Sequence, residues 1–417
     1  MLLDQMGSYD LDVGIGNEVS QTLRDLSLTP FQVVENYVRL VHPWLPIIKS
    51  PRLTTQLETT QRDQPLTLKA ETAALLLFIH LATQSSSNER AHNSDLQRKV
   101  YKQCQSMFTL LQAFRRSALE TRQCGVLLTT YQLGAGFISD AYVTLSTASG
   151  LVHVHQPCPF ARESYKDERD DEARRVWWAV FLLDRLIAQS HWKKRSYPLI
   201  IEQPPWWSEL PSEGSLTAAP IRITDIGTCH CEYFCREIQA AYLAAQTLEY
   251  RSDHDRKEGF EPDLSKLSTQ LTTLLNVLFE TAPGSWRPSC GAIAMIIAAT
   301  LDLHLSVSGL STNNTPAQLA YPMETLATTI RINTEIVTNS LDDNDDNEFQ
   351  DRLPITGVIA NYRTALAICH RAEVNQALTT EERFQLVTMT RALQRGRLRW
   401  GLADVYLQEI SGMLDVW

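Results

Sequence analysis

Apolar residues recur along most of the chain at the three- and four-residue spacing of an α-helix, and convincing alternating strand patterns are absent. In Phe31–Val41, for example, one face is apolar, and Pro43 follows as a stop signal. The same criterion predicts helices over residues 68–83, 96–111, 115–133, 138–152, 167–191, 225–250, 264–280, 286–307, 319–340, 353–378 and 381–414. We therefore predict an all-α fold, an irregular array of mostly antiparallel helix pairs forming one large helical domain.

Two segments break the helical pattern. Residues 196–220 contain five prolines and predict an irregular connection, and residues 341–351 (LDDNDDNEFQD) predict a solvated acidic loop. No fixed-period repeat is evident, so a regular solenoid is not indicated. We expect a leader over residues 1–29 and the helical domain over residues 30–417, with residue 220 as an alternative point of subdivision.

Composition and charge favour a globular protein that binds DNA weakly or not at all by itself. Hydrophobic residues make up 44% and charged residues 21% of the 417, and the formal net charge is −10. A domain that neutralises DNA phosphates usually carries a basic patch or a basic balance. The dense basic stretches are expected to be solvated helix ends. They are Lys193, Lys194 and Arg195, and the spaced Arg391, Arg395, Arg397 and Arg399.

The sequence does not predict a membrane segment. The first residues contain neither a basic region nor a continuous apolar run, so a secretory signal is not indicated. The most apolar stretch, Ala292–Leu301, is shorter than a bilayer-spanning helix and predicts a buried core helix. We expect an intracellular, soluble protein whose eight scattered cysteines are reduced.

The metal-binding patterns are weak. Cys229, Cys231 and Cys235 cluster, but they form no Cys-x-x-Cys pair and lack a second pair farther on, so packing is the favoured interpretation. A second group is His153, His155 and Cys158, where ligands two residues apart would need an extended or loop backbone. A structural role is favoured there too, and we expect no metal.

No catalytic pattern emerges either. The sequence contains no His-Glu-x-x-His, phosphate loop or Gly-x-Ser-x-Gly elbow, and Gly134-Ala-Gly136 lacks the third glycine of a dinucleotide fingerprint. We therefore expect no cofactor and no enzymatic activity.

Three separated segments carry a family resemblance. The first, Tyr37–Leu53, is a tyrosine-bearing helix leading into His42-Pro43 and a Pro-Ile step. The second contains Gly-Leu-Val-His, then an acidic and arginine-rich stretch and RRVWWAVFLLDR. The third, near the C-terminus, has Trp-x-x-Ala-x-x-Tyr spacing from Trp400. Together they resemble the regulatory, or middle homology, region of fungal zinc-cluster transcription factors.

The family motif positions are expected to be structural. They are His42, Pro43, Arg174, Arg175, Trp177, Trp178, Phe181, Asp184, Arg185 and Trp400. The aromatic residues would anchor a helix in the core. The adjacent Asp184 and Arg185 would point in different directions, each toward a charge on another helix, for example Arg174 or Asp140.

The resemblance implies a nuclear transcription regulator, and two departures qualify it. A Gly-Arg-Pro step of the family is replaced by HWKKRSYPLII, and no six-cysteine cluster or basic recognition segment is present. A regulator without its own DNA-binding cluster would act through a zinc-cluster factor or another nuclear protein, or as a homodimer, and could sense an effector, for example in controlling a biosynthetic gene cluster. A sequence fragment or an incomplete gene model would show the same pattern. A helical scaffold in a non-promoter assembly and an enzyme on the same scaffold are the alternatives.

Overall fold

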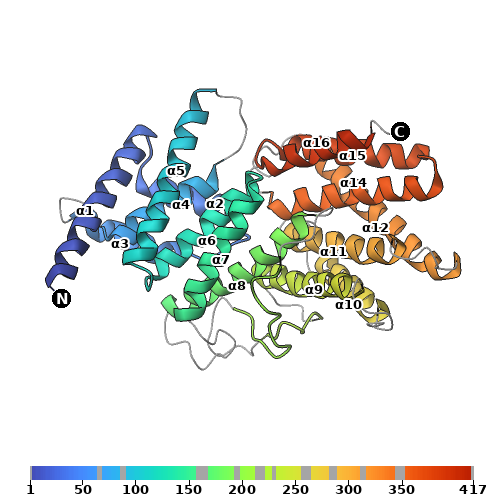
Figure 1. Cartoon of the computed structure of the whole chain (residues 1–417), viewed down its shortest axis with the longest axis horizontal. Coiled ribbons are helices and arrows are strands. Elements are labelled where there is room, and N and C mark those ends of the chain that lie inside the picture. The colour runs from blue at the N-terminus through green and yellow to red at the C-terminus, as the bar shows by residue number, and fades with distance from the viewer. Residues whose placement is uncertain are drawn as a thin grey trace. The chain divides into compact units, whose positions relative to one another are not determined.

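The structure is a computed structural model in which residues 2–62, 68–84, 91–155, 168–191, 198–211, 221–227, 232–254, 264–280, 289–309, 316–342 and 353–414 are described. These described residues form helices joined by turns (Figure 1). Their strand pairing is limited to one isolated bridge between Glu209 and Arg222. The predicted all-α fold is confirmed. The chain divides into two compact units, Met1–Asp184 (unit 1) and Arg185–Trp417 (unit 2). The division thus falls inside a helix, whereas the sequence suggested a point near residue 220.

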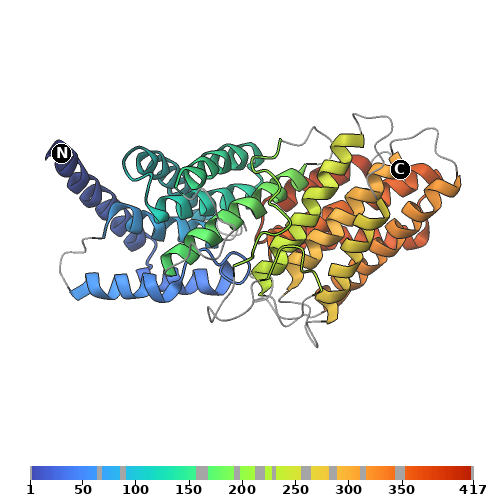
Figure 2. The ribbon, with the colours of Figure 1, turned by 90° about the horizontal axis from the view of Figure 1, so that it is seen from below.

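Unit 1 surrounds the apolar helix α4. Its helices are α1 (Leu2–Asp25), α2 (Pro30–Leu40), α3 (Ser50–Arg62), α4 (Ala70–Thr83), α5 (Ala91–Phe114), α6 (Leu119–Gly134) and α7 (Ile138–His155), followed by α8 (Glu168–Ser190), which crosses into unit 2. Every residue of α4 is buried, and α1, α2, α5 and α6 all contact it. Helices α6 and α7 pack together as a hairpin across the short link at Ala135–Phe137 (Figures 1 and 2).

Unit 2 is built around α11. Its helices are α9 (Tyr233–His254), α10 (Leu264–Glu280), α11 (Cys290–Gly309), α12 (Pro316–Asp342), α14 (Ile355–Asn375), α15 (Thr380–Gly396) and α16 (Leu402–Leu414). Helix α11 contacts α9, α10, α12 and α14. The apolar stretch of α11 is longer than the Ala292–Leu301 segment expected from sequence. By length and composition alone, Cys290–Ser308 could cross a bilayer. Because 89% of that window is buried by the protein itself, it has the character of a core helix.

Four local predictions need correction. Two helices were not predicted: α1, which buries Ile15, Val19 and Leu23 in the expected leader, and α3, which begins at Ser50 with Pro51 in its first turn. The sequence predicts a helix from residue 225, but residues 221–227 lie in turns and α9 starts at Tyr233. The single helix predicted over residues 381–414 is interrupted after Gly396.

Helix α15 ends at Gly396, where it lies close to α14. A Cβ at Gly396 would meet the Val358 side chain at 3.1 Å. Tight turns follow, with the Arg399 N–H donating to the Gly396 carbonyl at 3.1 Å. The acidic run predicted to be a loop over residues 341–351 lies mostly outside the described residues, apart from the end of α12.

Candidate functional site: a buried motif network and an inter-helix pocket

The segment after α2 folds around one tyrosine hydroxyl. Tyr37 is fully buried, donates its O–H to the Leu45 carbonyl at 2.8 Å, and accepts the N–H groups of Ile47 and Ile48 at 3.0 and 3.1 Å. Burial raises the pKa of this phenol above its usual value. The His42 ring lies edge-on to Tyr37, with ring centroids 5.6 Å apart. The first motif therefore fixes a tight, largely buried turn, from which Pro43 projects as an exposed residue.

The start of α8 binds the end of that turn. Glu172 accepts the backbone N–H of Lys49 at 2.5 Å, and the Lys49 ammonium pairs with Asp171 at 3.1 Å. Asp171 also accepts from Arg175 Nε at 3.1 Å. The acids of the second motif thus hold the first motif in place through specific contacts, in addition to any favourable interaction with the helix dipole.

Arg52 links three helices at this point. Its Nε lies 2.8 Å from Glu172 Oε2 and its Nη1 lies 3.1 Å from Glu120 Oε1, so α3 is joined to α8 and α6. Arg169 Nη2 pairs with the second oxygen of Glu120 at 3.1 Å. Burial raises the pKa of Glu172, although the Lys49 N–H and the Arg52 guanidinium act in the opposite direction. We refer to Tyr37, Lys49, Arg52, Glu120, Asp171, Glu172 and Arg175 as the motif network.

The aromatic part of the second motif is packed inside the protein. Trp177 and Phe181 stack with ring planes 5° apart, and Trp178 meets each of them edge-on. The rest of the motif is buried as well: Arg174, Arg175, Asp184 and Arg185 are each at most 5% exposed. Being buried, these side chains are not available at the surface to bind a ligand.

The adjacent Asp184 and Arg185 fall on either side of the division between the units. Arg185 Nη2 donates to the backbone carbonyl of Ile201 at 2.8 Å. Asp140, suggested as a charge partner, accepts from the Tyr101 hydroxyl at 3.3 Å. A charged partner for Asp184 or Arg185 stays a prediction.

The structure does not bring together the weak metal-ligand candidates His153, His155 and Cys158 within the residues that it describes. His153 and His155 are exposed and belong to α7, where residues two apart project from different sides, so they lack the extended or loop backbone that a metal site with this spacing would need. His153 Nδ1 donates to the Ser149 carbonyl at 2.8 Å. Cys158 lies outside the described residues. Within the described ranges, no three metal-ligating side chains of the His, Cys, Asp and Glu types gather.

The described residues include only Cys235 of the cysteine group and none of the first basic stretch. Cys229, Cys231 and Lys193–Arg195 lie outside the described residues, whereas Cys235 is buried and donates its S–H to the Pro211 carbonyl. Of the C-terminal arginines, Arg391 and Arg397 are exposed as expected.

The other two arginines, Arg395 and Arg399, are not the solvated side chains that the sequence predicts. Arg399 is 4% exposed, and its guanidinium lies 4.6 Å from the centre of the Trp400 ring. Arg395 Nη1 donates to the carbonyls of Ser340 and Leu341, at 3.3 and 3.2 Å, in the last turn of α12. Cations suit this position, because the carbonyls at a helix C-terminus carry partial negative charge.

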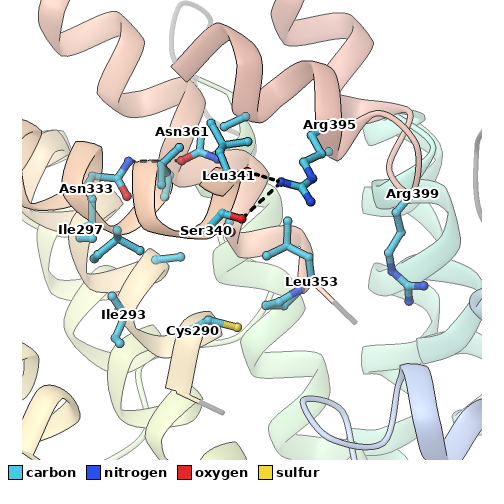
Figure 3. A pocket seen from close by; sticks show the side chains of 18 residues that line it. Cys290, Ile293, Ile297, Asn333, Ser340, Leu341, Leu353, Asn361, Arg395 and Arg399 are labelled. Carbon is cyan, nitrogen blue, oxygen red and sulfur yellow. Dashed lines mark hydrogen bonds between the residues drawn. The ribbon is translucent and has the colours of Figure 1, made fainter. Parts of the chain in front are cut away.

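Arg395 and Arg399 line a pocket within unit 2, enclosed mainly by α11, α12, α14 and α15 (Figure 3). Its cavity volume is about 80 Å³, and the pocket is partly open to solvent. Most of the lining is aliphatic, including Ile293, Ile297 and Val337. We call it the inter-helix pocket. A mostly aliphatic lining with a few polar groups is typical of small-molecule sites between packed helices.

Two amides form a polar spot in the inter-helix pocket. Asn333 Nδ2 donates to Asn361 Oδ1 at 3.2 Å and to Thr364 Oγ1 at 2.8 Å. Trp400 Nε1 donates to the carbonyl of Leu353, another lining residue, at 2.9 Å. The sequence does not reveal the pocket residues, because they come from four helices and from the segments before α14 and after α15, which sequence spacing does not relate.

A known family model matches the part of the chain that contains the motif network. Residues 34–192 match the model of the fungal specific transcription factor domain. The resemblance predicted from the first two segments is confirmed over this range, which includes the whole motif network. The Trp400 segment and the inter-helix pocket lie outside it. No curated protein and no solved structure matches the chain.

Proposed function

We propose that this protein is a transcription regulator that acts in the fungal nucleus through protein contacts. The observation that supports the proposal is the match of residues 34–192 to the fungal specific transcription factor domain, together with the motif network that this range builds. The buried motif residues stabilise the helical scaffold. The family is a transcription factor domain and not an enzyme family.

The DNA contact in this proposal comes from a partner. The net charge of −10 disfavours phosphate binding by the chain, and Arg399, one of the few clustered cations, is buried. A zinc-cluster factor or another nuclear protein would supply the DNA-binding surface, and a homodimer would be a second way of assembling. The inter-helix pocket supports an added role in sensing a small effector, such as a compound made or consumed by a controlled gene cluster.

The proposal is tested by chromatin association. The full chain, tagged and expressed at native level in a fungal cell, is expected in the nucleus and cross-linked at a defined set of promoters. The purified chain alone should bind a promoter fragment no better than random DNA at physiological salt. Cytosolic residence without promoter occupancy would overturn the proposal, and tight sequence-specific binding by the purified chain would overturn its partner-supplied DNA contact.

A further inference from the structure

We propose that the outward face of α15 is a docking site for an acidic amphipathic helix of a partner protein. This face consists of Arg383, Phe384, Val387, Arg391 and Gln394, and we call it the α15 face. It gives a class of partner to the protein contacts of the proposed function, and only its consequence for transcription rests on that function. The α15 face lies outside the residues that match the family model.

Helix α15 packs into unit 2 along one side and is exposed along the other. Its buried residues, such as Leu386, Met389 and Leu393, lie on the side that contacts α12, α14 and α16 (Figure 1). With about 3.6 residues per turn, the five residues of the α15 face fall within about 100° of the helix circumference, on the side away from that core. Phe384 and Val387 are 58% and 51% exposed. Two large apolar side chains and two arginines therefore share one uncovered helix face.

The spacing along the α15 face suits a second helix. Phe384, Val387, Arg391 and Gln394 follow one another at intervals of three, four and three residues. This is the spacing of the a and d positions in a coiled coil, where the seam of one helix packs against the seam of another. An amphipathic helix presents its apolar anchors at the same intervals. An extended peptide presents its side chains with a period of two residues, which does not match this seam.

The charge of the α15 face favours an acidic partner. Arg383 and Arg391 are exposed, and within the described part of the chain neither forms an ion pair. By contrast, Arg397 just after α15 lies 4.0 Å from Asp404. Among the exposed residues of α15, all of them described, the acid is Glu381, which already accepts a side-chain hydrogen bond. Because guanidinium groups bind carboxylates through paired N–H···O bonds, acids beside the apolar stripe of the partner would complement both arginines.

Other occupants fit the α15 face less well. Two copies of this chain meeting through it about a twofold axis would bring Arg383 or Arg391 of one copy near the same arginines of the other, and like charges across an interface are unfavourable. Binding to a bilayer scales with the apolar area inserted, and here Phe384 and Val387 supply it alone. Two arginines on a chain with a net charge of −10 make a weak phosphate-binding surface.

The test measures binding of two designed, fluorescently labelled peptides to the purified full chain by anisotropy. Both peptides have about three heptads with leucine at a and d, and they differ in carrying glutamate or lysine at e and g. We expect the glutamate peptide to bind saturably, one to one, and at least tenfold more tightly than the lysine peptide. Binding should weaken as salt is raised, because the charges lie at the surface.

A charge reversal tests the role of the arginines. The chain carrying both Arg383→Glu and Arg391→Glu is expected to prefer the lysine peptide, whereas the parent prefers the glutamate peptide. Arg331→Glu changes an arginine on α12 that is 58% exposed, and it should bind both peptides as the parent does.

The apolar positions are tested by a second pair of variants. The chain carrying Phe384→Ser and Val387→Ser should bind the glutamate peptide at least tenfold more weakly. Val143→Ser, at a 65% exposed position of unit 1, should leave binding unchanged. Because all these side chains are exposed, circular dichroism should show the variants folded as the parent is.

Several results would overturn the proposal. They are no saturable binding, equal binding of the two peptides, and a charge-reversed chain that keeps the preference of the parent. Dimerisation through Phe384, or binding of anionic vesicles or DNA that the same variants abolish, would assign the face to another occupant. A gain in peptide binding when the acids of residues 343–351 are changed to amides would assign it to the chain's own acidic run.

The outcome for the docking site is separate from the outcome for the proposed function. The peptide measurements use no promoter, so a chain that binds the glutamate peptide without affecting transcription would refute the proposed function and leave the docking site standing.

Discussion

Glu172 on α8 accepts the backbone N–H of Lys49, a residue 123 positions earlier in the chain, at 2.5 Å. The same carboxylate pairs with Arg52, and its side chain has no exposed surface. The end of the first motif is thus held by a residue of the second, which explains why the two segments occur together in one domain. The motif network is a stabilising structure, and its disruption should be measurable as a loss of stability.

Replacing Glu172 by alanine should lower the free energy of unfolding by about 3 kcal/mol, because it leaves a buried N–H and an arginine without this acceptor. Urea unfolding followed by circular dichroism measures the loss. Asp95→Ala removes an exposed carboxylate in the same unit, 87% exposed in its pair with Arg98, and should change stability by less than about 0.5 kcal/mol. Equal effects of the two substitutions would contradict the account of the network.

A buried ion pair in unit 2 should show strong coupling. Arg363 Nε lies 3.2 Å from Asp302 Oδ1, and the same guanidinium donates to the carbonyls of Gln189 and His191 at the end of α8. Arg363→Met should cost about 3–5 kcal/mol, because it leaves Asp302 buried without this cation. Adding Asp302→Leu to that variant should restore part of the stability. A double variant whose loss equals the sum of the two single losses would exclude the coupling.

Gly291 should tolerate no side chain without a local shift. A Cβ there would lie 2.0 Å from Glu237 Oε1, so the buried Glu237 carboxylate would have to move. Gly291→Ala should destabilise the protein by about 1–3 kcal/mol through overpacking. Gly412→Ala, in α16 of the same unit with open space around it, should raise stability by about 0.5–1 kcal/mol because alanine favours a helix. Thermal unfolding of both variants tests the difference in sign.

The buried His304 should make unit 2 sensitive to acid. Burial lowers its pKa from the ordinary 6.5 to about 4, so the folded protein holds it neutral while the unfolded chain protonates it first. Its contribution to stability is fully present above pH 6.5 and is lost as the pH falls toward 4. His304→Gln should therefore reduce the loss of unfolding free energy between pH 7 and pH 4.5 by about 2 kcal/mol.

The comparison is made by urea titration at several pH values. Between pH 7 and pH 8, above both pKa values, the difference between the parent and His304→Gln should stay constant. A parent and a variant that lose stability in parallel below pH 6.5 would rule out this role for His304.

The sequence predicts where long amphipathic or apolar helices lie, because their spacing is a local property. It locates α10 over Leu264–Glu280 and places α2, α7 and α8 to within a few residues. It fails for α3, where the polar, threonine-rich segment shows little except Leu53 and Leu57, both buried. It also misses the interruption after Gly396.

Contacts between distant segments account for the rest. Acidic residues in the first turns of a helix suit its dipole, yet Glu172 near the start of α8 is also a buried partner of Arg52 and Lys49. Arg399 belongs to a basic stretch that predicts exposure, and it is buried against Trp400. The partners of Glu172 lie in α3 and the turn before it, which spacing along the chain cannot reveal.

The most direct test of the central claim is a tethered reporter assay. The full chain is fused to a heterologous DNA-binding domain and brought to a reporter promoter in a fungal cell, with Glu172→Ala as the variant that weakens the motif network. We expect the parent fusion to change reporter transcription severalfold and the variant to lose this effect in proportion to its loss of folded protein. A stable, nuclear parent fusion that leaves the reporter unchanged at every promoter tested would contradict the claim that this protein regulates transcription.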